Sequence, residues 1–558
     1  MRCLSACRSM HGRLVASLLL AACLAPVAGF GRAADRQVLL VAAVDSYADL
    51  KKQIAWFGGQ IGSPGLAAMV ESLIMLSTQG QGVAGLDVQR PLGIVVTSDG
   101  TDVAAQAYVP VKDLDKLLAS LQAVIGPARK DGDTREVVLP SGVRLEITER
   151  DGWATIAPGG LAPADPAPLL AALSKAYTVG IEAFPSRMTD AVRKKFEAAL
   201  DQAAAASAAQ GRPMDPAALK AALGGLRQTE SLALGLAIDP EAGALFVENR
   251  AVAEPGSASA AASVAAAQGT LTVGTPPLAG GERPAVRGYV AQSIPEATRT
   301  EFLEALGQSL PREADDPLTR TVSRLVYDLL AAAVSAGGID AALAVDTSGA
   351  TKERPLPAVT AGVRVKDGAA LERQVKQAFA AGGGALAGVK TAFDAGKAGP
   401  ANLHRISVEV PDEALAARLG KSVELTLAVA PEYAIVLAGG DVAARAEAAL
   451  AASGRPIANA APIASLEAAA APLLDYIGTV ASAGPAANRD AAAPEADAGL
   501  VGLSVRPIER GFATRLSIDT AAIQAGAALA APPRPVGPGG IPLPDVPPGF
   551  PIPVPVPR

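Results

Sequence analysis

Two short sequence blocks occur twice in this chain, in the same order, and this repetition limits the folds that the chain can adopt. Residues 109–113 (Val-Pro-Val-Lys-Asp) recur as residues 363–367 (Val-Arg-Val-Lys-Asp), with four of five positions identical. Residues 143–160 align without a gap to residues 423–440. The spacing between the blocks is 26 residues longer in the second copy, which indicates an insertion at residues 382–401. The repetition predicts a duplicated scaffold with two halves of similar architecture.

The hydrophobic pattern within each copy predicts β-hairpins that alternate with helices. The Asp99-Gly100 pair separates two apolar runs, and Asp-Gly favours tight hairpin turns because it tolerates positive φ. Asp113 and Asp367 are expected to cap the helices that follow the repeated block. Residues 463–480 are predicted to form one further helix. The resulting fold class is α+β, with tandem ferredoxin-like (split) units, antiparallel sheets, helices on one face and internal duplication.

These patterns and the composition divide the chain into seven segments. The segments are a signal peptide (1–34), α+β unit 1 (35–175), α+β unit 2 (176–273), a linker (274–283), α+β unit 3, which repeats unit 1 (284–455), α+β unit 4 (456–530) and a disordered proline-rich tail (531–558). The tail is expected to be extended, because closely spaced prolines such as Pro555 and Pro557 exclude helices and inner strands.

The N-terminus is typical of an export signal, because three arginines precede an apolar run at residues 14–27 and small residues follow it. All three cysteines, Cys3, Cys7 and Cys23, lie in this segment. The mature chain is therefore expected to lack disulfides, thiol nucleophiles and thiolate metal sites. Two processing routes stay open: cleavage near Ala33, or lipidation of Cys23, because the preceding Leu-Ala-Ala resembles a lipobox. The expected location is the periplasm or the cell surface.

Charge and aromatic content exclude several function classes. Without the four arginines of residues 1–34, the chain holds 45 basic and 55 acidic residues, a formal charge of −10. An acidic chain without a basic cluster does not fit nucleic-acid binding or attraction to anionic lipid. Aromatic residues make up only 3%, too few for a platform on which bases or sugars stack. No segment after residue 34 is long and apolar enough to span a bilayer.

Motifs for metal or phosphate chemistry are incomplete. Residues 383–391 resemble a phosphate loop, but Val389 separates the last glycine from the lysine, so a flexible insertion is expected. His404 is the only histidine outside the export segment, which excludes a Cys/His zinc site, and it is expected at the surface or a strand edge. Residues 131–136 hold three acids, but they lack the spacing of a calcium loop and predict a solvated turn.

Other polar and aromatic residues have structural interpretations. Acids recur in predicted turns, and turn chemistry explains them better than a catalytic carboxylate pair does. These turn acids are Asp99, Asp102, Asp151, Asp239, Glu241 and Asp346. Trp56, Met69 and Met75 lie at helical spacing, which predicts a core position rather than a partner-binding groove. No catalytic, cofactor-binding or metal-binding residue is assigned, and no cofactor is expected.

The export segment, the alternation of hairpins with helices and the proline-rich end resemble uncharacterised exported bacterial proteins built of repeated α+β hairpin–helix units. That resemblance implies no functional residue. The expected function is an exported non-catalytic scaffold or binding protein of the cell envelope, with an unknown envelope protein or surface component as its partner. One alternative is an envelope hydrolase that uses Asp/Glu or Ser/Lys in a cleft between the halves, and another is a lipoprotein anchored through Cys23. The active surface is expected where the copies differ, at residues 382–401.

Overall fold

A computed structural model describes most of the chain. The described residues are 36–138, 144–157, 165–209, 226–269, 271–273, 284–309, 317–351, 354–381, 388–410, 412–413, 416, 419–454, 463–480 and 499–530. The expected signal peptide with Cys23, the linker at residues 274–283 and the tail at residues 531–558 lie outside the described residues. The structure is a mixed α/β protein with one large antiparallel sheet, so the coarse fold class is confirmed.

The first half of the described chain contains ten strands and six α-helices. In chain order they are β1 (Gln37–Val44), α2 (Tyr47–Gln60), α3 (Leu66–Ser77), β2 (Leu92–Ser98), β3 (Val103–Pro110), α4 (Leu114–Ile125), β4 (Arg129–Asp131), β5 (Thr134–Val138), β6 (Arg144–Arg150), β7 (Trp153–Ala157), α5 (Pro166–Ala176), β8 (Val179–Ala183), α6 (Asp190–Ala209), β9 (Thr229–Asp239), β10 (Ala244–Ala253) and α8 (Ala258–Ala266). Two short 3-10 helices, η2 (Pro185–Arg187) and η3 (Leu226–Gln228), flank α6 in this half.

The second half of the described chain has the same number of strands and α-helices, in the same order. They are β11 (Val286–Ser293), α9 (Glu296–Ser309), α10 (Pro317–Ser335), β12 (Gly338–Asp346), β13 (Ala358–Arg364), α11 (Gly368–Ala381), β14 (Val389–Ala398), β15 (Ala401–Glu409), β16 (Ser422–Val429), β17 (Tyr433–Ala438), α13 (Val442–Ala452), β18 (Ala464–Ala469), α14 (Ala470–Val480), β19 (Leu500–Ile508), β20 (Gly511–Asp519) and α15 (Thr520–Ala530). In this order α3 corresponds to α10, and α5 corresponds to α13.

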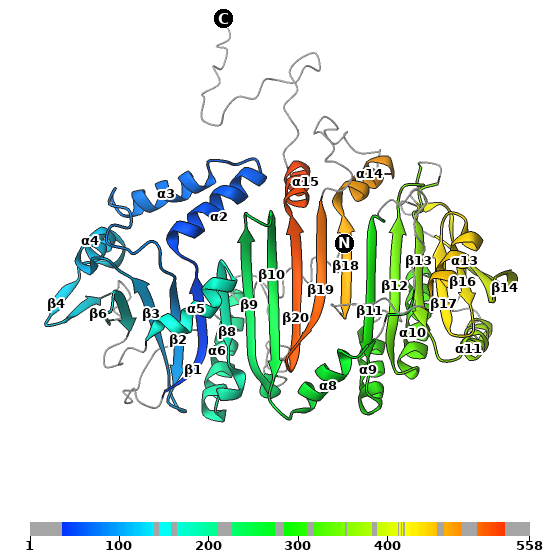
Figure 1. Cartoon of the computed structure of the whole chain (residues 1–558), viewed down its shortest axis with the longest axis horizontal. Helices are drawn as coiled ribbons and strands as arrows, with labels where there is room; N and C mark the ends of the chain where they lie inside the picture. Colours follow the sequence, from blue (N-terminus) through cyan, green and yellow to red (C-terminus); the bar gives the residue numbers. More distant parts are fainter. Residues whose placement is uncertain are drawn as a thin grey trace, which may run out of the picture.

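The strand pairing joins both halves into one continuous sheet (Figure 1). All described pairings are antiparallel, and their order is β4-β5-β6-β7-β3-β2-β1-β8-β9-β10-β20-β19-β18-β11-β12-β13-β17-β16-β15-β14. From either outer edge inward, corresponding strands follow one another in the same order, and β10 meets β20 at the centre. The two halves are thus arranged like partners about a twofold axis at the β10–β20 pair.

The tandem ferredoxin-like units are not confirmed. A split βαβ unit places a helix between two strands that do not pair with each other, whereas here the first strand of each half pairs directly with the second, β1 with β2 and β11 with β12. The sheet also runs without a break from the first expected unit into the second, because β8 pairs with β1. Each half therefore contributes one stretch of a shared sheet.

Helices lie on both sides of the sheet, which corrects the expectation of one covered face. Leu173 of α5 and Tyr177, which follows α5, pack against Gly180, and Tyr177 also packs against Gly235. α13 packs on the same side of the sheet, against Ile435. The strand register links Gly235 to Ile435 through directly paired residues, so both lie on the same side of the sheet. Adjacent residues along each strand point to the opposite side. On that opposite side, α10 and α11 cover the outer strands of the second half.

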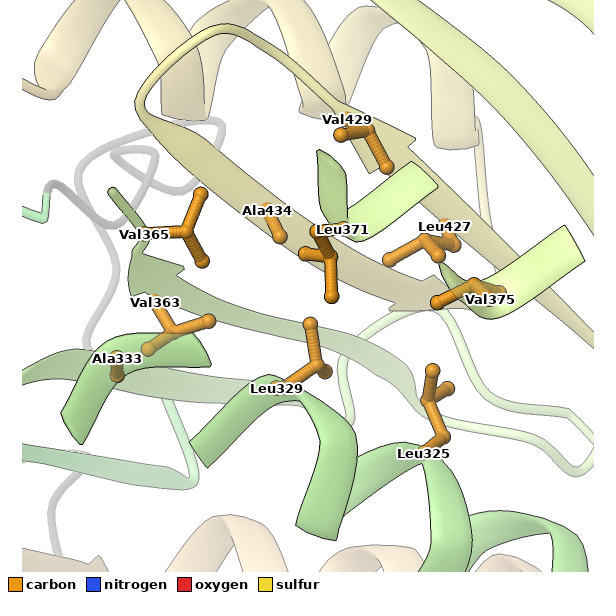
Figure 2. Close-up of a cluster of buried hydrophobic side chains, with 10 residues drawn as sticks. All are labelled: Leu325, Leu329, Ala333, Val363, Val365, Leu371, Val375, Leu427, Val429 and Ala434. Atoms are coloured by element: carbon orange, nitrogen blue, oxygen red, sulfur yellow. The ribbon is translucent and has the colours of Figure 1, made fainter. Parts of the chain in front are cut away.

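The best-packed core of the second half shows how α10 and α11 cover this side (Figure 2). Leu329 and Leu325 of α10 point toward Leu371 and Val375 of α11. Val363 of β13 and Leu427 of β16 belong to the same cluster. Each of these side chains is less than one-tenth exposed. Full burial of one such aliphatic side chain contributes about 1.5–3 kcal/mol, so this cluster fixes α10 on the sheet.

Four strands were not predicted from the sequence. Residues 131–136, expected as a solvated turn, lie in the β4–β5 hairpin. Residues 463–480 form strand β18 followed by helix α14 instead of a single helix. Part of the expected flexible insertion, Val389–Ala398, is strand β14, while residues 382–387 lie outside the described residues. Short or polar strands gave no clear two-residue alternation, and pairing with neighbours decided their structure.

Candidate functional site

The central strands present an apolar surface that no described helix covers. We call it the open face: the side chains of β9, β10, β20, β19 and β18 that point away from α5. It comprises Leu232, Leu234, Leu236 and Ile238 of β9, Leu245, Val247, Asn249 and Ala251 of β10, Phe512, Thr514, Leu516 and Ile518 of β20, Val501, Leu503, Val505 and Pro507 of β19, and Ala464, Leu466 and Ala468 of β18. None of these residues is charged, and none is buried.

The most exposed members of the open face lie in one row across the sheet. Leu466, Leu503 and Leu516 are directly opposite one another on β18, β19 and β20, and they are 42%, 40% and 38% exposed. The row continues through Val247 and Leu236 on β10 and β9. It crosses the junction of the two halves without interruption, so both halves contribute to a single surface.

The size of the open face lies at the upper end of the range for the largest apolar patch of a typical monomer. Five strands at a spacing of about 4.8 Å and four side chains at about 6.7 Å along each strand cover roughly 600 Å². The largest apolar patch on a typical monomer is about 300–600 Å², and larger patches mark interaction sites. The polar members, Asn249 and Thr514, are cross-strand neighbours near the centre, and the Asn249 Oδ1 atom is buried without a hydrogen-bond partner.

The opposite side of the same strands is polar, and Tyr177 covers part of it at β9 and β10. A Cβ atom on Gly235 would lie only 2.2 Å from the Tyr177 ring, so this glycine lets the tyrosine pack flat on the sheet. The Tyr177 hydroxyl donates a hydrogen bond of 2.8 Å to Glu248 Oε1, and burial raises the pKa of Tyr177 to about 12. The Arg515 guanidinium donates to Glu248 Oε2 at 2.8 Å and lies over the ring of Phe246. This network links β10 of one half to β20 of the other.

A second apolar surface lies beside the first half on helix α3. Met69, Leu73, Met75 and Leu76 are 55%, 59%, 45% and 77% exposed, and α3 has no buried residue. The prediction that Met69 and Met75 are core residues is wrong, because within the described part of the chain both side chains stay about half exposed. Trp56 of α2 is partly buried. Helical spacing identified the apolar stripe but not what covers it.

His404 lies in the interior and not at the surface, which corrects the expectation. It is 1% exposed on β15, and its Nε2 atom is 3.5 Å from Glu372 Oε1 of α11 and has no hydrogen-bond partner. Asp394 of β14 completes a group of three residues whose potential metal-ligand atoms lie within 4.8 Å of one another. Sequence reasoning missed this group because its members come from three elements, one of them unpredicted.

The contacts within this group favour an ion-pair network over a metal site. The backbone N–H of Asp394 donates to His404 Nδ1 at 3.1 Å, which places the proton of the neutral ring on Nε2. A metal-bound histidine instead donates its second ring N–H to an acceptor. The Lys376 ammonium, 2.7 Å from Glu372 and 2.9 Å from Asp394, holds the position between the carboxylates. Burial lowers the pKa of His404, and the hydrogen bond to Glu372 raises the pKa of Lys376.

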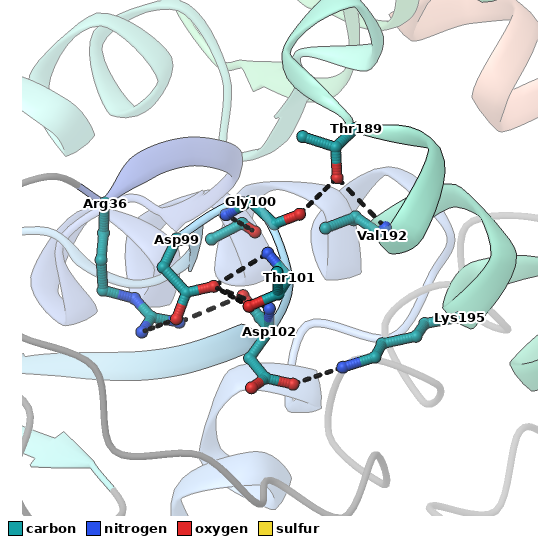
Figure 3. Close-up of polar contacts among 9 residues, drawn as sticks. Arg36, Asp99, Gly100, Thr101, Asp102, Thr189, Val192 and Lys195 are labelled. Carbon is teal, nitrogen blue, oxygen red and sulfur yellow. Dashed lines mark hydrogen bonds and ion pairs between the residues drawn. The ribbon is translucent and has the colours of Figure 1, made fainter.

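The acids at the β2–β3 turn have structural roles (Figure 3). Asp99 Oδ1 accepts hydrogen bonds from the backbone N–H groups of Thr101 and Asp102, at 2.9 and 2.7 Å, and Arg36 pairs with its other oxygen. These hydrogen bonds lower the pKa of Asp99 to about 2. Asp102 forms an ion pair with Lys195 of α6 and so ties that helix to the turn. Turn hydrogen bonds therefore account for Asp99, and the ion pair with α6 accounts for Asp102.

The repeated block has the expected capping role in both halves. The Asp113 carboxylate accepts a hydrogen bond of 3.0 Å from the backbone N–H of Lys116 at the start of α4. Asp367 accepts one of 2.9 Å from the backbone N–H of Ala370 in α11. Both caps satisfy a helix N–H that has no partner within the helix. Asp239 and Asp346 accept similar bonds in their own turns.

Comparisons of the chain with models of known families, with curated proteins and with solved structures find no match. Within the described part of the chain, no helix combines the length and the apolarity needed to cross a membrane. The two carboxylates that meet, Glu372 and Asp394, lie within the second half and are paired with Lys376, whereas the hydrolase alternative places its carboxylates between the halves.

Proposed function

We propose that the protein is an exported, non-catalytic binding protein and that the open face is its binding surface. The observation that carries the proposal is the uncharged row through Leu466, Leu503 and Leu516, which crosses the centre of the sheet and is exposed. Hydrophobic residues exposed singly need no explanation, but a contiguous apolar sheet face costs solubility unless something covers it. The opposite side of the same strands carries charged residues such as Glu248 and Arg515, so the uncharged side is the one that suits an apolar partner.

The occupant that fits the open face is an amphipathic helix of a protein partner. Where this side of the sheet is covered, the chain's own helices cover it, as Leu325 and Leu329 of α10 do over β13. A helix with an uncharged apolar stripe matches the open face, which has no charged residue. Its binding there would bury no charge without a partner. This recognition is a helix-in-groove mode, with anchors spaced three and four residues apart.

Duplication of an ancestral half supports the scaffold side of the proposal. The repeated sequence blocks fall on equivalent elements, since residues 109–113 and 363–367 both connect a strand to a capped helix. The order of strands and helices agrees between the halves throughout the described chain. We infer that joining two copies through β10 and β20 created the broad central surface that neither copy has alone.

The proposal is tested with a peptide that carries the sequence of α10, Pro317–Ser335, labelled with a fluorophore. Its own position on the protein is already filled, so the peptide can bind only elsewhere. We expect fluorescence anisotropy to show saturable binding to the full chain. Substitution Leu503→Glu is expected to weaken that binding at least about tenfold, because a buried unpaired carboxylate costs more than the roughly 1.4 kcal/mol of a tenfold change.

The matched control is Ser465→Glu, which adds the same charge to the opposite side of the neighbouring strand β18. This variant is expected to bind the peptide as the parent chain does. A peptide with Leu325→Asp and Leu329→Asp, which lacks the apolar stripe, is expected not to bind. Equal affinities of the Leu503→Glu and Ser465→Glu variants would reject the open face as the binding surface.

A further inference from the structure

We propose that helix α3 is a lid that docks on the strands β2 and β3, on the side of the sheet that carries the open face. This inference goes beyond the proposed function, because β2 and β3 lie outside the open face, although on the same side of the sheet. Its motivation is the position of α10, the corresponding helix of the second half, which packs against β12 and β13. The strands β2 and β3 correspond to β12 and β13, yet in the structure α3 lies away from them at the end of the sheet (Figure 1).

Both surfaces that the docking would bury are apolar, and each has accessible side chains, whereas Val96, on the same side of β2 as Ile94, is already buried. On α3, Met69, Leu73 and Leu76 follow the i, i+4, i+7 spacing of one helical face, and each is more than half exposed. On the strands, Ile94 of β2 lies opposite Ala107 of β3, and both are partly exposed. Ala107 aligns with Ala361 at the same offset as the repeated block, and Val363, two residues after Ala361, belongs to the cluster that α10 covers.

The connections on both sides of α3 are suited to such a movement. Gly62 precedes the helix and Gly80 and Gly82 follow it, all three with positive φ. Glycine adopts these conformations without steric cost, and hinges are a few residues that absorb large changes of φ and ψ. The segment is fixed again only at Gly85, whose carbonyl accepts hydrogen bonds from the backbone N–H groups of Lys112 and Asp113.

α3 packs on α2 through half-buried side chains such as Leu66, Val70 and Ile74, but it has no buried residue. Its ion pair with α2, between Glu71 and Lys51, is 2.8 Å long but about half exposed on both sides. Exposed ion pairs of this kind contribute little to stability. A lid needs two positions of similar free energy, and loosely held helices at the low end of local stability provide them.

Engineered cysteines test the docking directly in a full chain whose Cys3, Cys7 and Cys23 are replaced by serine. The reporter pair is Leu73→Cys with Ala107→Cys, and a disulfide forms only when their Cβ atoms approach to about 3.5–4.5 Å. The control pair is Leu73→Cys with Ser465→Cys, which lies on the opposite side of the sheet. Oxidation is followed by intact mass and by gel mobility with and without reductant.

We expect the reporter pair to cross-link at least tenfold faster than the control pair. Equal rates for the two pairs would overturn the lid. A second reporter, Met69→Cys with Ile94→Cys, decides the matter if the first variant does not fold. Because the Leu503→Glu test uses the central strands and does not involve α3, failure of the lid and failure of the proposed function give different results.

Discussion

Helices α3 and α10 hold the same place in the order of elements, but only one of them belongs to a core. α10 buries Leu325, Leu329 and Ala333 against the sheet, whereas α3 exposes Leu73 and has no buried residue. The contrast shows that an apolar stripe specifies a helix that needs a partner surface without specifying which surface it meets. In the second half the partner is the sheet of the same chain, and in the first half the surface is left available.

The largest expected effect separates the two helices by stability. Leu329→Ala removes a side chain that is 7% exposed from the centre of a packed cluster, so it should lower the free energy of unfolding by about 2–5 kcal/mol. Leu73→Ala on α3 should change it by less than about 0.5 kcal/mol, since the side chain is 59% exposed. Urea denaturation of both variants measures the difference. Equal losses would mean that α3 is held in a core in solution.

A smaller effect is expected where the two halves meet. Glu248→Ala would leave the Tyr177 hydroxyl and the Arg515 guanidinium without their shared acceptor, at a cost of about 1–3 kcal/mol. Because Glu248 lies on the strand that joins the halves, the unfolding transition should also broaden as the halves lose coupling. Glu71→Ala, which breaks the exposed pair between α2 and α3, is the control and should leave calorimetric traces unchanged. A sharp, unshifted transition for Glu248→Ala would show that strand pairing alone couples the halves.

The smallest effect concerns pH and only the second half. Burial lowers the pKa of His404, so below its ordinary value of about 6.5 the unfolded chain takes up a proton that the folded chain does not. Stability is therefore fully present above that pH and falls as the pH drops below it. The groups that face the ring are Glu372, Lys376 and Asp394. The corresponding position of the first half is Arg135, opposite Ile147 on β6, so the first half has no histidine at this place.

The substitution that tests this prediction is His404→Asn, which keeps an acceptor for the Asp394 backbone N–H. Melting temperatures from about pH 7.5 to about pH 5.5 should fall less steeply for the variant than for the parent. The chain has two histidines, so few other groups contribute in this interval. Parallel pH profiles for parent and variant would contradict the prediction.

The local structure was largely predictable from the sequence. The capping role of Asp113, the Asp-Gly turn at Asp99 and the bounds of α2 follow from propensities that act over a few residues. Strand β9 also shows alternating apolar residues, a pattern that indicates one apolar side. The sequence does not show whether that side is covered, because coverage depends on helices that are distant in the chain.

The candidate surfaces needed the structure for the same reason. Leu466, Leu503 and Leu516 come from three strands, and only the pairing register places them in one row. His404 was assigned to the surface because polar residues are usually exposed, whereas three elements surround it. The prediction that the active surface lies at residues 382–401 stays untested, and β14, which covers part of that range, lies at the outer edge of the sheet.

The single strand ladder that joins the halves in the described chain also has a consequence for folding. Glu248 and Arg515 meet across β10 and β20 although they are 267 residues apart in sequence, whereas β9–β10 and β19–β20 are local hairpins. Contacts between distant residues form slowly, because the loop must close before any contact compensates for its entropy. Each half should therefore complete its own hairpins first, and the sheet should become continuous in a late step. During translation, β10 remains an unpaired sheet edge until most of the second half has been synthesised, because its partner strand on that side is β20.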